Sequence, residues 1–321
     1  KKAKQFSNQL NSMYHDGLMK TQKQREIISY NLQKLTEDLM IEFFNDIHKK
    51  FPEYTKIAVA GGLFANVKLN QKLNELDWLD ELFVYPPMGD EGLSLGAALW
   101  KSNQLGELKK PLKLTSFSFG PSYDEESIYE FSKEFDFIRT GLDYDEIAKD
   151  IHSGKIIGWF DGGMEFGPRA LGNRSLLVRP TQLETHKVLN RRLNRYDTMP
   201  FAPMVLDEHF EDLFTTNKSK YSAQFMTICY STKTEWMDKI PAVVQKSDKT
   251  ARPQVITSEN NPKIYHLMKR YFELSSIPAI LNTSFNTHGE PIIENPSQAF
   301  NHLKNKVVDK LVIGNYVYQN R

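Results

Sequence analysis

The sequence has 321 residues and a single cysteine, Cys229, so a disulfide framework is excluded. We therefore expect a reducing, cytoplasmic environment, with Cys229 as a small core residue rather than a nucleophile. No apolar run approaches the roughly 20 residues that span a bilayer, which predicts a protein without a membrane segment. An excess of one charge is also missing, because 41 Lys and Arg face 40 Asp and Glu. No global field draws the chain to nucleic acid, and we predict no nucleic-acid partner.

Several catalytic patterns are absent as well. None of the eight histidines is paired with another at a spacing of three or four residues, which excludes a two-histidine metal site on one helix. The chain has neither a GxSxG elbow nor a GxxxxGK[ST] loop. The sequence thus points away from serine-hydrolase and P-loop chemistry, and any anion site has to be built locally.

Hydrophobic periodicity predicts an alternation of helices and strands, which is typical of an α/β protein. A change of composition over 101–122 indicates a linker, and we predict domains at 1–105 and 123–321 joined by 106–122. The predicted helices cover 21–50, 66–76, 94–100, 124–135, 143–153, 182–194, 261–274 and 296–304. The predicted strands cover 57–60, 82–85, 137–138, 156–160, 176–178, 225–230, 277–281 and 309–317.

One stretch, residues 158–179, concentrates chemical side chains between two apolar strands. Glu165, Arg169, Asn173, Arg174 and Ser175 fall within eleven residues that also contain glycines and a proline. Glycines let a backbone approach a ligand closely, and arginine forks suit phosphate or carboxylate. The stretch predicts an anion-binding loop; the alternative is a polar loop with an ordinary Glu–Arg surface pair.

Further donors follow later strands. Four arginines offered from turns suit a doubly anionic ligand such as a phosphate ester, which they would position and stabilise without covalent chemistry. We predict catalytic roles for Arg169, Arg174 and Arg252. We predict substrate contacts for Glu165, Asn173, Ser175, Arg195, Gln254, Asn282, Thr283, Ser284 and Asn286.

The first part of the chain carries weaker signals. Gly61 and Gly62 separate a strand from a helix, a place where a ligand can lie against backbone. Asp90 follows another strand end, where α/β folds place ligand and metal chemistry. The N-cap of the next helix explains Asp90 equally well, and the sequence leaves both interpretations open.

Six ordered blocks resemble the O-carbamoyltransferases of the nodulation and antibiotic-tailoring type. They are AGGLFANVKLNQKL, PPMGDEGLSLGAAL, MEFGPRALGNRS, MPFAPMVL, TARPQVI and LNTSFNTHGEPI. The resemblance runs from about Asn8 to Tyr318 and implies two domains. The first is implied to be the second half of an acetate kinase/heat-shock-70/actin-type domain. The second is implied to be an α/β domain like that of the threonylcarbamoyl-adenylate synthases.

The resemblance also implies an activity. The second domain would convert carbamoyl phosphate and ATP to carbamoyl-adenylate, and the first would pass the carbamoyl group to the hydroxyl of a small molecule or sugar. By resemblance, Gly61, Gly62 and Asn66 match the motif that contacts adenosine, and Asp90 matches a ligand of a divalent metal, iron or magnesium. The positions that match the surroundings of carbamoyl phosphate and the adenylate are Arg169, Asn173, Arg174, Ser175, Arg195 and Arg252.

This sequence also departs from the family pattern. Members of the family are implied to carry a further half-domain before Lys1, with a phosphate-contacting loop and histidine metal ligands. Lys246 stands where histidine is frequent, and Gly163 where a larger polar residue is common. An alternative hypothesis is therefore a half-enzyme or binding module that needs a separate N-terminal partner or forms a homodimer. A tRNA-modifying enzyme of the related fold is disfavoured by the near-zero net charge.

Overall fold

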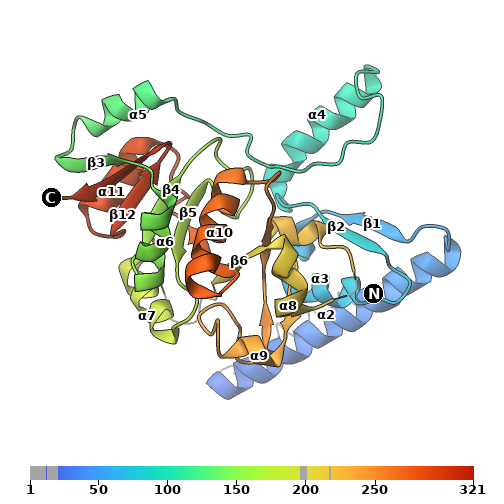
Figure 1. Ribbon diagram of the computed structural model, residues 1–321. Coiled ribbons are helices and arrows are strands. Elements are labelled where there is room, and N and C mark those ends of the chain that lie inside the picture. Colours follow the sequence, from blue (N-terminus) through green and yellow to red (C-terminus); the bar gives the residue numbers. More distant parts are fainter. Residues whose placement is uncertain (1–11, 13–20, 196–200, 217) are drawn as a thin grey trace.

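The computed structural model describes residues 12, 21–195, 201–216 and 218–321 (Figure 1). Its centre is a mixed eight-stranded sheet built from the second part of the chain. The strands lie in the order β10-β6-β11-β5-β4-β12-β13-β3. Their bounds are β3 Phe137–Gly141, β4 Ile157–Phe160, β5 Arg174–Val178, β6 Ala202–Leu206, β10 Gln254–Ile256, β11 Ala279–Ser284, β12 Lys310–Ile313 and β13 Tyr316–Asn320. Only the pairs β10–β6 and β4–β12 are parallel within this sheet as described.

Helices cover both faces of this sheet, because alternate residues of each central strand point to opposite sides. Helices α6 Tyr144–Ser153 and α10 Pro262–Ser275 lie side by side over one face (Figure 1). Ile157 and Trp159 of β4 pack beneath them, whereas Phe160 packs on the opposite side. That opposite face carries α5 Glu125–Ser132, α7 Leu183–Arg192 and α11 Pro296–Lys304. The predicted α/β class is confirmed as a three-layer arrangement.

Local signals explain where these helices begin and end. The side chain of Asp143 accepts hydrogen bonds from the first turn of α6, and Gly154 ends that helix with a φ of 98°. Asn261 caps α10, and Pro262 occupies its first turn. Asn295 and Gln298 form a reciprocal capping box at the start of α11.

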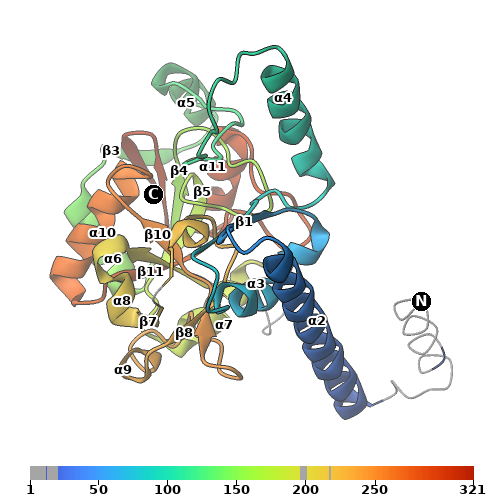
Figure 2. The same ribbon diagram turned by 90° about the vertical axis from the view of Figure 1, so that its right-hand side faces the viewer.

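The first part of the chain builds a smaller layer around two parallel strands, β1 Lys56–Val59 and β2 Glu81–Val84. Its elements are the long helix α2 Gln22–Lys50, the turn η1 Gly62–Ala65, helix α3 Val67–Asn74, the turn η2 Asp90–Gly92 and helix α4 Leu93–Gln104. Helices α2 and α3 pack on the strands through Phe44, Leu69 and Leu73. Helix α4 has no buried residue and stands away from the body (Figures 1 and 2).

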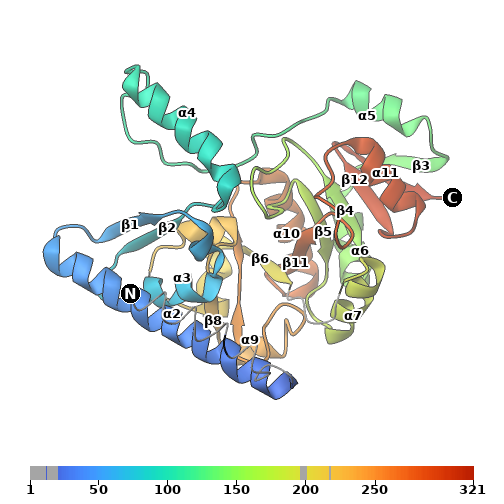
Figure 3. The same cartoon turned by 180° about the vertical axis from the view of Figure 1, so that it is seen from behind.

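The two parts meet through a segment that follows β6. This segment contains η3 Asp207–His209, α8 Phe210–Leu213, β7 Phe214–Thr215, η4 Tyr221–Phe225, β8 Tyr230–Thr232, α9 Thr234–Met237 and β9 Thr250–Ala251. Strands β7, β8 and β9 form a small antiparallel sheet beside α3 (Figure 3). Asn70 of α3 donates to the carbonyl of Thr227 at 2.7 Å, and Ser222 bonds both Val84 and Leu82 of β2.

Two predicted strands are wrong. The expected strand 225–230 is broken because η4 ends at Phe225 and Met226 is left-handed with a φ of 55°, so pairing begins only at Tyr230. The expected single strand 309–317 is a hairpin of β12 and β13, since Gly314 turns the chain with a φ of 61°. The composition changes from residue 101, but the linker begins only after Gln104, because α4 continues to that residue.

In the part of the chain that the structure describes, no helix combines the length and apolar character required to cross a membrane. The polar stretch 1–17, whose sequence shows no clear hydrophobic period, lies outside the described residues except for residue 12.

Candidate anion-binding site

A cavity of about 200 Å³ lies where the carboxyl end of β11 meets the start of β6 and the loop between β4 and β5. Antiparallel pairing explains this meeting point, because Asn282 faces Ala202 and Ser284 faces Ser175 in the sheet register. The side chains that end β11 are therefore held next to the glycine-rich loop. Residues lining the cavity include Pro168, Arg169, Arg195, Phe201, Met226, Arg252, Asn282, Thr283, Ser284, Asn286 and His288.

Seven of the predicted site residues line this one cavity, although they come from four separate segments of the sequence. They are Arg169, Arg195, Arg252, Asn282, Thr283, Ser284 and Asn286. The structure therefore brings the predicted donors together, and three of them are arginines. Their anionic ligand stays a prediction.

Arg195 is fixed by the strand-end wall of the cavity. Its guanidinium donates to the Thr283 hydroxyl at 2.8 Å, to Oγ of Ser284 at 3.0 Å and to Oδ1 of Asn286 at 2.9 Å. It also donates to the carbonyl of Asn286 at 3.2 Å. Burial lowers the pKa of Arg195 from its ordinary value. This arginine is a rigid donor whose bonds set its direction.

Arg169 and Arg252 differ from Arg195 because neither side chain forms a hydrogen bond or ion pair with any described residue. Both are partly buried. Burial lowers the pKa of Arg169. Burial, followed by the nearby charge of Arg169, lowers the pKa of Arg252. Two like charges that pair with no described acidic residue, held at a cavity wall, are an arrangement that favours an anion.

The glycine-rich loop between β4 and β5 is held by buried side chains that sequence reasoning assigned to the ligand. One carboxylate oxygen of Glu165 accepts the backbone N–H groups of Leu171 at 2.6 Å, Asn173 at 2.7 Å and Arg174 at 3.2 Å. Ser175 accepts the N–H of Gly172 at 3.0 Å. These contacts order the loop rather than line the cavity.

Two amide side chains complete the loop from the sheet side. Gln254 donates to the carbonyl of Leu171 at 2.7 Å, and Asn282 donates to the carbonyl of Ala170 at 3.0 Å. Asn282 also donates to Oε1 of Gln254 at 2.9 Å. Asn173 turns away from the cavity and donates to Ser118 and to the Gly163 carbonyl.

Arg174, for which we predicted an anion contact, is fully buried beneath the loop. Its guanidinium lies 3.6 Å from the centre of the Phe160 ring and donates to the carbonyls of Asp161, Gly162, Asn173 and Pro121 at 2.9–3.2 Å. The structure does not place Arg174 in the cavity. The alternative of an exposed Glu–Arg surface pair is wrong, because Glu165 and Arg174 are both buried.

The residues predicted in the first part of the chain lie outside this cavity. Gly61 and Gly62 form an exposed turn after β1, with a φ of 109° at Gly61. Asn66 caps α3 through the N–H of Leu69 and exchanges hydrogen bonds with Gln33. Their predicted adenosine contact is untested.

Asp90 is exposed at the start of η2. The N-cap interpretation of Asp90 is wrong, since Gly92 caps α4 without a side-chain bond. Nor does any group of three or more His, Cys, Asp or Glu gather at a potential metal site within the described ranges. The described residues therefore form no complete metal site around Asp90, and its role as a metal ligand stays a prediction.

A second cavity of about 210 Å³ shares Phe201 and Arg252 with the first. Its other wall includes Lys68 of α3 and Asp248, which form an ion pair at 2.9 Å. A further groove of about 440 Å³ shares Phe201, Val243 and Gln245 with this second cavity. Sequence reasoning missed Lys68 and His288, although Lys68 lies within the block AGGLFANVKLNQKL and His288 within the block LNTSFNTHGEPI.

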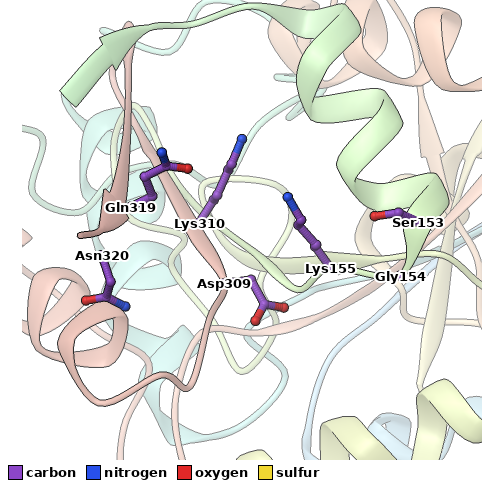
Figure 4. A pocket seen from close by; sticks show the side chains of 7 residues that line it. All are labelled: Ser153, Gly154, Lys155, Asp309, Lys310, Gln319 and Asn320. Carbon is purple, nitrogen blue, oxygen red and sulfur yellow. The ribbon is translucent and has the colours of Figure 1, made fainter. Parts of the chain in front are cut away.

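A larger pocket of about 470 Å³ lies between the end of α6 and strands β12 and β13, as Figure 4 shows. Its charged side chains are compensated. Lys155 and Lys310 pair with Asp150 at 2.6 Å, and Asp309 pairs with Arg192 at 2.8 Å. This pocket therefore lacks the free positive charge that distinguishes the arginine-lined cavity.

Comparisons with known proteins match two families along the chain. Residues 148–320 match the family described as carbamoyltransferase C-terminus, and residues 3–99 match the one described as carbamoyltransferase N-terminus. An uncharacterized protein of Methanocaldococcus jannaschii, MJ1058, is 35% identical over 307 residues, which cover 92% of this chain and 49% of that protein. Nodulation protein NolO of Bradyrhizobium diazoefficiens is 31% identical over 311 residues, 95% of this chain and 56% of NolO.

The chain spans about half the length of the curated relatives it matches. Among solved structures, it is similar to full-length HypF in the phosphate- and nucleotide-bound form, with a TM-score of 0.41 and 21% identity over 56% of this chain and 22% of HypF. It is also similar to E. coli YciO, with a TM-score of 0.38 and 15% identity over 53% of this chain and 76% of YciO.

Proposed function

The chain belongs to the carbamoyltransferase family, and on that premise we propose that its arginine-lined cavity binds carbamoyl phosphate and supports ATP-dependent activation of the carbamoyl group. The product would be carbamoyl-adenylate, from which the carbamoyl group passes to an acceptor hydroxyl of a small molecule or sugar. The observation that carries this proposal is the pair Arg169 and Arg252, which line a small cavity and form no ion pair with a described residue.

The proposed reaction proceeds in three steps. Water takes up the phosphoryl group of carbamoyl phosphate and leaves carbamate and inorganic phosphate. A carbamate oxygen then attacks the α-phosphorus of ATP and displaces pyrophosphate. The acceptor oxygen finally attacks the carbamoyl carbon and AMP leaves, with the hydroxyl proton passing to solvent. Each of the first two steps moves negative charge between phosphate oxygens, where fixed cations are effective.

Within this proposal the three arginines have different tasks. Arg195, held by Thr283, Ser284 and Asn286, positions a phosphate as a rigid donor. Arg169 and Arg252 meet the charge that develops on the phosphate oxygens, since their donors are uncommitted. At neutral pH all three arginines are protonated, so they bind and stabilise rather than transfer protons.

We also propose that the first part of the chain is the second half of an acetate kinase/actin-type domain, which takes part in the transfer step. Gly61, Gly62 and Asn66 would contact adenosine there. No step is assigned to a metal, because Asp90 stands without further ligands in the described part of the chain.

The test is carbamoyl-phosphate-dependent exchange between ATP and pyrophosphate. We expect Arg169→Ala and Arg252→Ala each to lower the exchange rate by roughly one to two orders of magnitude, about the loss of one or two charge-assisted contacts. Arg270→Ala is the matched control, because Arg270 is an exposed arginine paired with Asp145 and Glu273 and should leave the rate unchanged. The proposal would be refuted if the wild type showed no exchange, or if both cavity variants exchanged at the wild-type rate.

The alternative, a binding module without activity of its own, has less support, because models of both family parts match within this chain. The exposed side chains of α4, including Leu93 at 71% and Trp100 at 63%, are the observation in its favour. Exchange activity in the isolated chain decides between the two.

A further inference from the structure

We propose that Glu165 is the positioning residue of Arg169, so that this buried carboxylate sets the affinity of the cavity for phosphate without touching the ligand. The inference rests on the proposed function only in taking the ligand to be a phosphate. It concerns how the binding arginine is held in place.

The side chain of Arg169 is held in a different way from that of Arg195. Arg195 is fixed by hydrogen bonds from its own side chain, whereas the Arg169 side chain bonds no described residue. The direction of Arg169 must therefore come from its backbone. An arginine loses rotamer freedom when it is ordered, so a backbone that already fixes the position of its Cα limits the entropy lost on binding.

That backbone is closed by Glu165. Only Phe166, Gly167 and Pro168 separate Glu165 from Arg169, and the N–H of Leu171 returns to the Glu165 carboxylate at 2.6 Å. The arginine thus sits within a seven-residue turn whose two ends are joined by one side chain. Gly167 adopts a φ of 132°, which favours glycine, and the proline ring restricts the position just before Arg169.

The remaining groups of the loop leave it little freedom. The carbonyls of Ala170 and Leu171 are taken by Asn282 and Gln254, and the N–H of Gly172 is taken by Ser175. Three of the four N–H groups that these side chains accept between residues 171 and 174 go to Glu165. Glu165 is therefore the principal acceptor of the loop.

Burial makes this acceptor costly to lose and hard to replace. Glu165 is 5% exposed, and its second oxygen is buried without a hydrogen bond from any described residue. Burial raises the pKa of Glu165, while its bonds with the loop N–H groups oppose that rise. The charge of Glu165 also favours the protonated guanidinium of Arg174. An alanine would leave three buried N–H groups without an acceptor.

The experiment measures inorganic phosphate binding to the full chain by calorimetry. The variants are Arg169→Ala, Glu165→Ala, Glu165→Gln and the two Glu165 changes combined with Arg169→Ala. We expect Glu165→Ala to raise the phosphate Kd about 10-fold, comparable with the loss of one charge-assisted contact. Glu165→Gln keeps an acceptor oxygen and should have a smaller effect. Neither change should raise the Kd further once Arg169 is absent, because the pair acts as a unit.

Asp150→Asn is the matched control. Asp150 is another buried carboxylate, paired with Lys155 and Lys310 beside the pocket of Figure 4, so its loss should lower the melting temperature without changing the phosphate Kd. If Glu165→Ala does not fold, the Glu165→Gln pair supplies the same comparison.

The outcomes separate two failures. A phosphate Kd that Arg169→Ala leaves unchanged overturns the proposed phosphate site, and the positioning role with it. A Kd that rises in Arg169→Ala but not in the folded Glu165 variants overturns the positioning role alone. Effects of Glu165 and Arg169 that simply add would also contradict it, because additive effects mean that Glu165 does not act through Arg169.

Discussion

The cavity has two walls that are built in opposite ways. At the end of β11, Thr283, Ser284 and Asn286 bond the guanidinium of Arg195, so the wall is ordered through side chains. In the loop between β4 and β5, buried side chains bond the backbone, and the Arg169 side chain bonds no described residue. One wall therefore presents a fixed donor and the other presents a free charge on a fixed backbone.

This difference explains why four arginines that the sequence alone does not distinguish take different roles. A guanidinium that already bonds carbonyls or hydroxyls has fewer donors left for a ligand, because its five N–H groups are shared. Arg174 has given its donors to four carbonyls, Arg195 has given part of them, and Arg169 and Arg252 have given none to the described residues. Under the proposed function, we therefore expect the ligand to bind on the side of the cavity with the fewest internal hydrogen bonds.

The most severe way to break this arrangement is Arg174→Ala. The change removes the arginine donor from four carbonyls, of which those of Asn173 and Pro121 keep a backbone N–H donor, and it removes the charge that compensates Glu165 beneath the loop. We expect a loss of about 3–5 kcal/mol in the free energy of unfolding, the usual cost of removing one partner from a buried charge network. Urea denaturation followed by far-ultraviolet circular dichroism measures it. A variant as stable as the wild type would show that Arg174 does not hold the loop.

A milder test uses pH to distinguish the two walls. Burial and the neighbouring Arg169 lower the pKa of Arg252, so its folded form releases a proton at a lower pH than arginine ordinarily does. Phosphate affinity should therefore fall in alkaline solution at a lower pH than that at which arginine ordinarily loses its proton. The folding stability of the ligand-free protein changes in the opposite direction. Between the folded and the unfolded pKa of Arg252 the unfolded chain binds more protons, so the contribution of Arg252 to stability rises with pH.

Calorimetric titration of phosphate at a series of alkaline pH values measures this effect, with Arg252→Lys as a comparison. A Kd that stays constant over the range in which the fold persists would contradict the lowered pKa. The expected change is the smallest here, because a bound anion itself stabilises the protonated guanidinium.

The sequence predicted much of this architecture because local signals were strong. Hydrophobic periodicity marked the helices, and apolar runs marked β4, β5 and β11, whereas β6 and β10 were not predicted. The hairpin around Gly314 was missed although a Gly-Asn pair between apolar runs is a turn signal. Periodicity alone merged the two strands, since both are apolar.

The site was predicted as a set of residues but not as a set of roles. Sequence alone does not separate Arg169 from Arg174, because the fate of Arg174 depends on the carbonyl of Pro121, which lies 53 positions away. Likewise, Gln254 and Asn282 were expected to touch the ligand, whereas the sheet register turns their amide groups to the loop backbone. Roles of this kind follow from long-range packing, which no local pattern records.

The central claim is that Arg169 and Arg252 form the charge that binds phosphate, and it is tested most directly by phosphate-induced thermal stabilisation. The wild-type chain should gain melting temperature as inorganic phosphate is added, because the ligand binds only the folded state. The Arg169→Ala/Arg252→Ala double variant should melt no lower than the wild type without phosphate, since two repelling charges are removed, and it should lose the phosphate-dependent gain. A double variant that keeps the full gain would contradict the account.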